Sequence, residues 1–199
     1  MRMKDKVVLV TGGAAGIGRA TALRFAEEGA TVVICDLNES AGQATAAELG
    51  AGAAFYKVNV TNQAEVRQWV AEVIARYGRI DVLVNNAGIV RDGQLVKFKE
   101  GALVGQMAEA DFDLVVSVNL KGVFNCTQAV APQMVQQGSG VILNASSVVG
   151  LDGNFGQNVK YAKIRSMEYT RGMYHDFMAK FGYTESVTHL RYRTTRSNP

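Results

Sequence analysis

Short runs of apolar residues alternate along this chain with longer segments in which apolar residues recur every three or four positions. The runs have the length of strands, and the periodic segments have the spacing of helices. Strands that are apolar throughout are typical of a parallel sheet buried on both faces. The alternation therefore predicts β-α-β units with right-handed crossovers. The five expected strands are residues 7–10, 31–35, 53–60, 81–84 and 141–144.

The expected helices lie between these strands. One follows the turn after the first strand, one spans residues 39–49, one is capped by Thr61 or Asn62, and a long one spans residues 109–137. Together they predict an α/β fold with a doubly wound parallel sheet of the Rossmann type. In such a fold, ligands bind at the carboxyl ends of the strands.

The turn after the first strand opens a helix and carries glycines at the spacing G-x-x-x-G-x-G, namely Gly12, Gly16 and Gly18, with Gly13 beside the first. Gly12 permits a tight turn, Gly16 lets the backbone approach a pyrophosphate, and Gly18 lets the helix pack closely on the sheet. The helix N-terminus offers free N–H groups and a positive dipole end to phosphates. We therefore expect a dinucleotide site that also includes Ala15 and Ile17; an ordinary strand-turn-helix is the alternative.

Asp36 ends the second strand, eighteen residues after Gly18. A dinucleotide fold places there the carboxylate that binds the adenosine ribose hydroxyls. The 2′-phosphate of NADP would be repelled by this carboxylate. No Lys or Arg stands among residues 13–15, and the nearest cation, Arg19, lies inside the helix. We therefore expect NAD(H) as the cofactor rather than NADP(H).

Length and composition favour one soluble domain. The chain has 199 residues, 48% of them hydrophobic and 20% charged, which is ordinary for a globular protein. No apolar run reaches membrane-spanning length and no signal peptide is visible, so a cytoplasmic location is the default expectation. The two cysteines, Cys35 and Cys126, are interpreted as small core residues, so neither a disulfide nor a metal site is expected.

The character of the chain changes near residue 158. Residues 158–199 carry 8 Lys or Arg against 3 Asp or Glu, together with five of the seven tyrosines. We interpret residues 1–157 as a Rossmann-type dinucleotide-binding domain and residues 158–199 as an atypical C-terminal segment of the same domain. A nucleic-acid contact by the basic, aromatic tail is disfavoured, because short tails of this charge are usually solvated.

Four motifs stand in order along residues 4–157. They are Thr11–Gly18, Asn85–Gly88, Val118–Phe124 and Asn144–Gly150, and Gly153–Gln157 follows the last. Together they resemble the short-chain dehydrogenase/reductase family, and most nearly its 3-oxoacyl-(acyl-carrier-protein) reductases.

The resemblance implies hydride transfer between a nicotinamide and a small ketone, a 3-oxoacyl thioester or a secondary alcohol. By motif, Ser147 would hold the substrate oxygen, Tyr161 would act as general acid and base, and Asn119 would hold a water in the proton relay. In the family a Lys one helical turn after the Tyr lowers the pKa of the Tyr and binds the nicotinamide ribose.

The resemblance also implies roles in cofactor binding and assembly. Asn86, Ala87 and Gly88 would line the adenosine side. The family usually has an Asp before the Val that ends the third strand; here Asn59 precedes Val60, and its amide oxygen could accept a similar hydrogen bond from the adenine amino group. A homodimer or homotetramer is implied as well.

The chain departs from the family after the last motif, because Tyr-x-x-x-Lys is absent. The residue four positions after Tyr161 is Arg165, whereas Lys163 points about 200° away on a helix. Arg165 keeps the positive charge that favours a tyrosinate, but its planar guanidinium does not replace an ammonium at a close-packed site. No Pro-Gly turn or later strand of the usual kind is found, so the C-terminal strands of the fold are expected to be missing.

Two functions follow from these observations. The first is an oxidoreductase with Asn119, Ser147 and Tyr161 in its relay and with Arg165 or Lys163 in the cationic role. The second is a dinucleotide-binding but catalytically impaired member of the family, whose sequence after about residue 158 comes from a shifted reading frame, a fusion or an altered exon. Both would bind NADH, and only the first would turn over.

Overall fold

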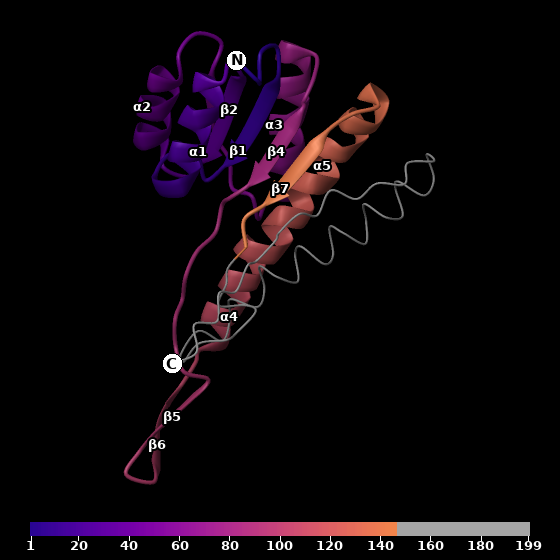
Figure 1. The fold of residues 1–199 in the computed structure, drawn as a ribbon. Helices are drawn as coiled ribbons and strands as arrows, with labels where there is room; N and C mark the ends of the chain where they lie inside the picture. Colours follow the sequence, from indigo (N-terminus) through magenta and orange to yellow (C-terminus); the bar gives the residue numbers. More distant parts are fainter. Residues whose placement is uncertain (147–199) are drawn as a thin grey trace, which may run out of the picture.

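The computed structural model describes residues 1–146 of the chain (Figure 1). No helix among these residues combines the length and the apolar character that a membrane crossing requires. The elements in chain order are β1 Val7–Thr11, α1 Gly16–Glu27, β2 Thr31–Asp36, α2 Glu39–Leu49, β3 Ala54–Lys57, α3 Gln63–Tyr77, β4 Val82–Asn85, β5 Val96–Lys99, β6 Ala102–Gln106, α4 Glu109–Val116, the π-helix η1 Ser117–Lys121, α5 Gly122–Gln137 and β7 Val141–Asn144.

Five strands form one parallel sheet in the order β3-β2-β1-β4-β7. In the central register, Val8 of β1 lies between Val32 of β2 and Val82 of β4. Helices α1 and α2 cover one face of this sheet, and α3 and α5 cover the other (Figure 1). The prediction of a doubly wound parallel sheet is confirmed.

Successive residues of β1 supply both cores, because neighbouring side chains of a strand point to opposite faces. Val8 and Val10 pack with Ala22 of α1, and Leu9 packs in the opposite layer with Trp69 of α3. Both cysteines are free and buried in this second layer, as the sequence predicts. Burial raises the pKa of Cys126 to about 12.

The structure refines several element boundaries. The helix expected at residues 39–49 is confirmed, and Asn62 is the cap of α3, because its Oδ1 accepts from the backbone N–H groups of Ala64 and Glu65. Strand β3 ends at Lys57, earlier than expected. The helical span 109–137 is interrupted by the π-helix η1, which the apolar periodicity of this segment did not predict.

The sequence did not predict the hairpin of β5 and β6, which stands away from the sheet (Figure 1). Residues 96–99 alternate between apolar and basic side chains, as a strand with two different faces does. The connecting residues Glu100 and Gly101 both have positive φ, 50° and 81°. Positive φ at both central residues is the signature of the tight turn that matches strand twist.

Asp81 anchors the opposite end of the sheet from the glycine turn. Its carboxylate accepts from the backbone N–H of Val7 at 3.0 Å, from Lys6 Nζ at 3.0 Å and from two guanidinium nitrogens of Arg79 at 2.7 and 2.6 Å. Its backbone N–H donates to Val7 and its carbonyl accepts from Val141, so β1, β4 and β7 all meet at this residue.

The pKa of Asp81 is lowered to about 2. Burial raises this pKa, but the hydrogen bonds from Arg79, from the Val7 backbone and from Lys6 lower it by more. A carboxyl with a depressed folded-state pKa stabilises the fold above its unfolded pKa of about 4 and loses that contribution as the pH falls toward the folded value.

We expect Asp81→Asn to lower the free energy of unfolding by about 1–3 kcal/mol at pH 7, because two cations and a buried N–H lose a charged acceptor. Urea unfolding of both proteins across pH 7 to 3 measures the difference, which should shrink in the acid range. Asp113→Asn, at a position without an ion pair in residues 1–146, is the control and should change stability by less than about 0.5 kcal/mol. A pH-independent difference would contradict this account.

Candidate dinucleotide site

The candidate site lies at the carboxyl ends of β1 and β4. These strands are neighbours in the sheet. The chain after β1 crosses to β2 on one side, whereas the chain after β4 continues to β7 on the other side. Ligands bind at such a reversal of strand order in open α/β sheets, because the loops there diverge. The turn after β1 and the segment Asn86–Gly88 after β4 border this position.

Thr11 and Asn86 fasten the two loops together. The Thr11 hydroxyl accepts from the backbone N–H groups of Asn86 at 3.1 Å and Ala87 at 3.0 Å. In return, Asn86 Nδ2 donates to the carbonyls of Thr11 and Gly12, at 3.1 and 3.2 Å. The loop after β4 is thereby fixed against the glycine turn.

The surroundings of Gly12, Gly16 and Gly18 differ. Gly12 has a φ of +65°, and a Cβ there would lie 2.9 Å from Ala87 Cα. A Cβ on Gly18 would overlap the carbonyl oxygen of Gly12, so only glycine lets α1 pack this close. Gly16, with a φ of +54°, faces open space, and that space is where a ligand can approach the backbone.

The first turn of α1 has the features of an anion-binding site. Asn38 and Asn62 cap α2 and α3, whereas Ala15 at the start of α1 has no side-chain oxygen to offer and no acid stands in the first turn. The first N–H groups of a helix have no partner inside it. Within residues 1–146 no acceptor binds those of residues 16–18, so they are available there together with the positive end of the helix dipole. Beside them, the side chain of Ile17 is 79% exposed.

Asp36, at the end of β2, borders this helix start. Its two oxygens accept from the backbone N–H groups of Ala14 and Asn38, both at 3.1 Å. In residues 1–146 no Lys or Arg forms an ion pair with it. Arg19, the cation nearest in sequence to residues 13–15 of the glycine turn, pairs instead with Glu48 of α2. The carboxylate charge is therefore not neutralised by the described part of the chain.

Asn59 and Val60 follow β3 beside the end of β2, since the N–H of Val58 donates to the backbone carbonyl of Asp36. The Asn59 amide oxygen accepts from the N–H and the hydroxyl of Thr61, at 3.0 and 2.9 Å. It therefore shapes its own turn, and a hydrogen bond from an adenine amino group to this oxygen stays a prediction.

Asn119 is 2% exposed and lies in the π-helix η1. Its Oδ1 accepts from the N–H of Ile89 at 2.8 Å, and its Nδ2 donates to the carbonyl of Ile89 at 2.9 Å. Both ends of the amide thus hold the chain directly after Gly88. Wide turns of this kind occur frequently at functional sites, and the expected contact of Asn119 with a relay water stays a prediction.

The other expected catalytic residues, Ser147, Tyr161 and Arg165, lie outside the described residues. The last described strand before them, β7, is fixed at its end. Asn85 Nδ2 donates to Asn144 Oδ1 at 2.8 Å and to the Thr127 hydroxyl at 3.2 Å.

Three supporting residues were not singled out from the sequence. Thr11 had a signal, its place at the head of the glycine motif. Thr45 donates its hydroxyl to the carbonyl of Ala14 at 3.0 Å, and Asn125 donates to the carbonyl of Val60 at 2.8 Å. Their signal is a polar residue on an otherwise apolar helix face, which is too common to identify a role.

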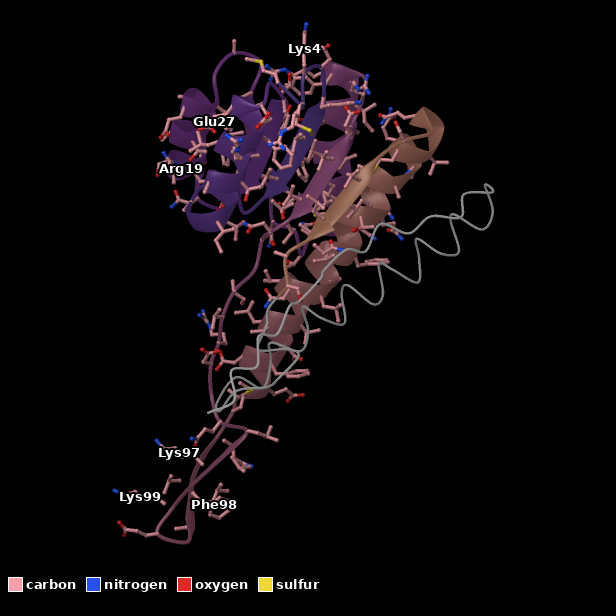
Figure 2. All side chains as sticks on the ribbon, viewed as in Figure 1. Lys4, Arg19, Glu27, Lys97, Phe98 and Lys99 are labelled. Atoms are coloured by element: carbon pink, nitrogen blue, oxygen red, sulfur yellow. The ribbon has the colours of Figure 1, made fainter. Side chains whose placement is uncertain are left out.

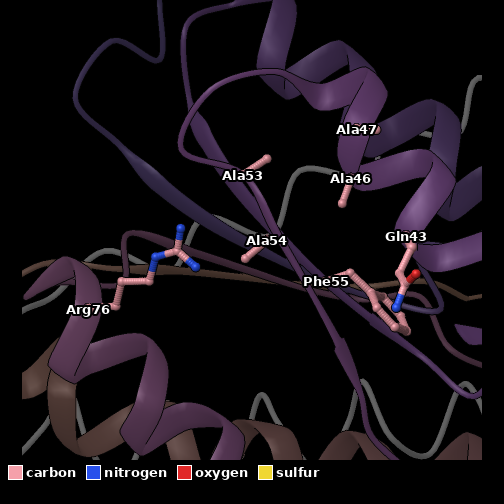
Figure 3. A pocket seen from close by; sticks show the side chains of 7 residues that line it. All are labelled: Gln43, Ala46, Ala47, Ala53, Ala54, Phe55 and Arg76. Atoms are coloured by element: carbon pink, nitrogen blue, oxygen red, sulfur yellow. The ribbon is translucent and has the colours of Figure 1, made fainter.

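A shallow hollow elsewhere does not compete with this site. It lies beside the start of β3, between α2 and α3, and small side chains leave it open (Figure 3). Arg76 is its only charged lining residue, and the glycine turn is at the other end of the strands. Within residues 1–146, no cluster of His, Cys, Asp or Glu has the arrangement of a metal site.

Comparison with known proteins connects this geometry to a family. The model of the short chain dehydrogenase family matches residues 6–178. The 3-oxoacyl-(acyl-carrier-protein) reductase of Thermotoga maritima is 49% identical over 160 residues, which are 79% of this chain and 61% of that protein. The reductase of the same name from Staphylococcus aureus is 44% identical over 156 residues, 76% of this chain and 60% of that protein.

A relative with a different substrate also matches. A hydroxy(phenyl)methylsuccinyl-CoA dehydrogenase subunit of Thauera aromatica is 43% identical over 159 residues, 77% of this chain and 59% of that protein. The chain therefore spans about three fifths of the length of these relatives. The family match passes residue 157 and includes the glycine turn, Asp36, the loop after β4 and η1. By this match and by the identity of its relatives, the chain belongs to the short-chain dehydrogenase family.

Proposed function

We propose that this protein is an oxidoreductase that transfers a hydride between NAD(H) and a carbonyl or secondary-alcohol substrate. The observation that carries the proposal is the start of α1, which has no side-chain cap and no acid in its first turn and lies next to the carboxylate of Asp36. This arrangement offers N–H donors for a pyrophosphate beside an acceptor for ribose hydroxyls.

The residues present fit a dinucleotide. The backbone N–H groups of residues 16–18 would bind the pyrophosphate, and the open space at Gly16 gives it room. Asp36 would accept the adenosine ribose hydroxyls, and its charge would repel a 2′-phosphate. Asn86, Ala87 and Gly88 would line the adenosine side, where Asn59 and Val60 follow the neighbouring strand. When bound, the nicotinamide gives or takes the hydride.

The protein itself would position the substrate and move the proton. Ser147 would donate its hydroxyl to the substrate oxygen, and Tyr161 would give that oxygen a proton as the carbonyl is reduced. Because an unperturbed Tyr titrates near 10, a neighbouring cation is needed at neutral pH, and Arg165 would supply it. Asn119 would hold the segment at Ile89 in place and would also hold a water of the proton relay that leads to Tyr161.

We infer a 3-oxoacyl thioester as the substrate class. Support comes from the printed activity of the relatives from Thermotoga maritima and Staphylococcus aureus. The relative from Thauera aromatica is named for a CoA thioester of another acid. A thioester with a ketone or hydroxyl nearby is common to these names, so it is the first substrate to try.

A second function has its own supporting observation. No Tyr in the chain is followed four residues later by Lys, and Tyr161 is followed by Arg165 instead. A family member with this change in its relay would bind the dinucleotide and turn over slowly or not at all. The two functions share the site at α1 and differ in the relay.

We expect Asp36→Asn to raise the affinity for NADPH relative to NADH by about tenfold or more, because the charge that repels a 2′-phosphate is removed. Calorimetric titration of each cofactor gives the ratio. Glu39→Gln removes a neighbouring exposed acid and should leave the ratio unchanged. Equal affinity of the wild-type protein for the two cofactors would contradict the proposed preference for NAD(H).

A second prediction concerns the open space at Gly16. Gly16→Ala should weaken NADH binding at least tenfold, because its methyl group would occupy the room beside the N–H groups. Gly138→Ala is a matched control, since that residue also has positive φ, +67°, and open space around it, but ends α5. Both changes should lower stability by about 1 kcal/mol, and only the first should lower NADH affinity. Equal NADH affinity of the two variants would refute the placement of the pyrophosphate.

The relay is tested by NADH oxidation with an acetoacetyl thioester. Ser147→Ala and Tyr161→Phe should each lower kcat by about 100-fold or more while NADH affinity stays unchanged. Arg165→Lys restores Tyr-x-x-x-Lys in sequence. A wild-type protein that binds NADH without oxidising it, and gains turnover on Arg165→Lys, would establish the second function instead.

A further inference from the structure

Strand β3 forms one edge of the sheet. In a parallel ladder, successive residues turn their N–H and C=O groups alternately to one neighbour and then to the other. The N–H of Val58 donates to the carbonyl of Asp36 in β2. Alternation then turns Tyr56 toward β2 as well, and Phe55 and Lys57 outward. Within the described part of the chain, no hydrogen bond joins the backbone groups of these two outward residues to another element.

The chain closes this edge at both ends and leaves its middle open. Before β3, the hydroxyl of Tyr77 donates to the carbonyl of Gly52 at 2.8 Å. After β3, the N–H of Asn59 donates to Glu65 Oε2 at 2.8 Å. The two N–H groups and two carbonyls between these closures are the ones that a single added strand would bond.

Two hollows beside this edge leave room for the side chains of an added strand. One, of about 440 Å³, lies at the start of β3, where Ala46 and Ala47 of α2 are small (Figure 3). The other, of about 240 Å³, lies at the end of β3 against Trp69 of α3. Since side chains of a strand alternate between its faces, those of an added strand would point toward α2 and α3 in turn.

The two hollows differ in charge. Arg76 borders the first, and it forms no ion pair with any described residue. Glu65 and Glu72 border the second, and among the described residues they accept only from neutral N–H groups. The nearby Lys57 is paired with Glu39. A strand that fits this edge therefore has an acid at its start and a base toward its end, both on the side of α3.

We propose that residues 183–192 of this chain, which lie outside the described residues, form that strand parallel to β3. Half of these ten residues are Val, Thr or Tyr, which favour strands, and none is Gly or Pro. The alternate positions Glu185, Val187, His189 and Arg191 share one face, with the acid first and the base last. The segment lacks the apolar run of a buried strand, which agrees with a position at the edge.

The register follows from the charges. It places Glu185 beside Ala54, where Arg76 borders the same hollow. It places Arg191 past the end of β3, on the side of Glu65. The other face of the segment then presents mainly Ser and Thr side chains to the small residues of α2.

The chain between β7 and this segment is long enough for the pairing. Residues 145–182 are 38 residues, which can span more than about 100 Å when extended. The sheet from β7 to β3 is four strand spacings wide, about 19 Å. The segment lies beyond the region that matches the family, and the pairing does not depend on the proposed enzymatic activity.

The test is hydrogen exchange of single backbone amides, followed by NMR in the full chain. The N–H groups of Phe55 and Lys57 have no acceptor among the described residues, so slow exchange there requires a further strand. We expect both to exchange about 100-fold more slowly than in an unstructured chain. The N–H of Tyr56, which faces β2, should stay protected in every variant and reports that the sheet is folded.

Charge reversal identifies the strand. Arg76→Glu and Glu185→Arg should each make the two outward amides exchange about fivefold faster or more, because like charges then meet. The double variant joins opposite charges again and should restore the wild-type rates within about twofold. As a control, Lys4→Glu changes an exposed lysine whose side chain points away from the sheet (Figure 2) and should leave the rates unchanged.

Fast exchange of both outward amides in the wild-type protein would overturn the proposal, because no strand would then cover the edge. Slow exchange that weakens on dilution would assign the edge to a second copy and overturn it too. Protection that neither reversal changes, or that the double variant does not restore, would exclude residues 183–192 as the strand.

Discussion

Two short polar side chains hold together the two loops that border the candidate dinucleotide site. Thr11 accepts hydrogen bonds from two backbone N–H groups of the loop after β4, and Asn86 returns two to the turn after β1. Neither loop has a helix or strand of its own at this point, so the loops lack the backbone ladders that fix the sheet. Their relative position is set by these four bonds and by the glycines that let the backbones touch.

The sequence predicts the sheet well because its signals are strong and local. Val7–Val10 and the later apolar runs are typical only of buried strands. Asn38 and Asn62 indicate where helices begin, because each side chain accepts hydrogen bonds from the first turn. The glycine spacing and Asp36 likewise predict where a dinucleotide would bind, and the structure brings these residues to one edge.

Other features depend on forces that a sequence pattern does not show. The helical periodicity of residues 109–137 is continuous across Asn119, so the wide turn that aims this side chain at Ile89 has no separate signal. The hairpin has short strands and a turn that begins with Glu100, a residue rarely found at positive φ. The roles of Ser147, Tyr161 and Arg165 rest on sequence resemblance alone.

The two aspartates Asp81 and Asp36 have different roles because their hydrogen-bond partners differ in charge. Asp81 is neutralised by Lys6 and Arg79 and serves as an anchor between strands. Within residues 1–146, Asp36 accepts only from backbone N–H groups, and Arg19, the cation nearest in sequence to the glycine turn, pairs with Glu48. No Lys or Arg of residues 1–146 forms an ion pair with this carboxylate, and in the proposed function its charge would repel a 2′-phosphate.

The strand order also determines when the candidate dinucleotide site can form during synthesis of the chain. Strands β1, β2 and β3 are joined by short local crossovers and can pair as soon as they emerge, whereas β4 must return across α3 to reach β1. Thr11 meets Asn86 only after this return. The candidate site is therefore the product of the first long-range closure of the chain, and any ligand that binds across it would stabilise that closure directly.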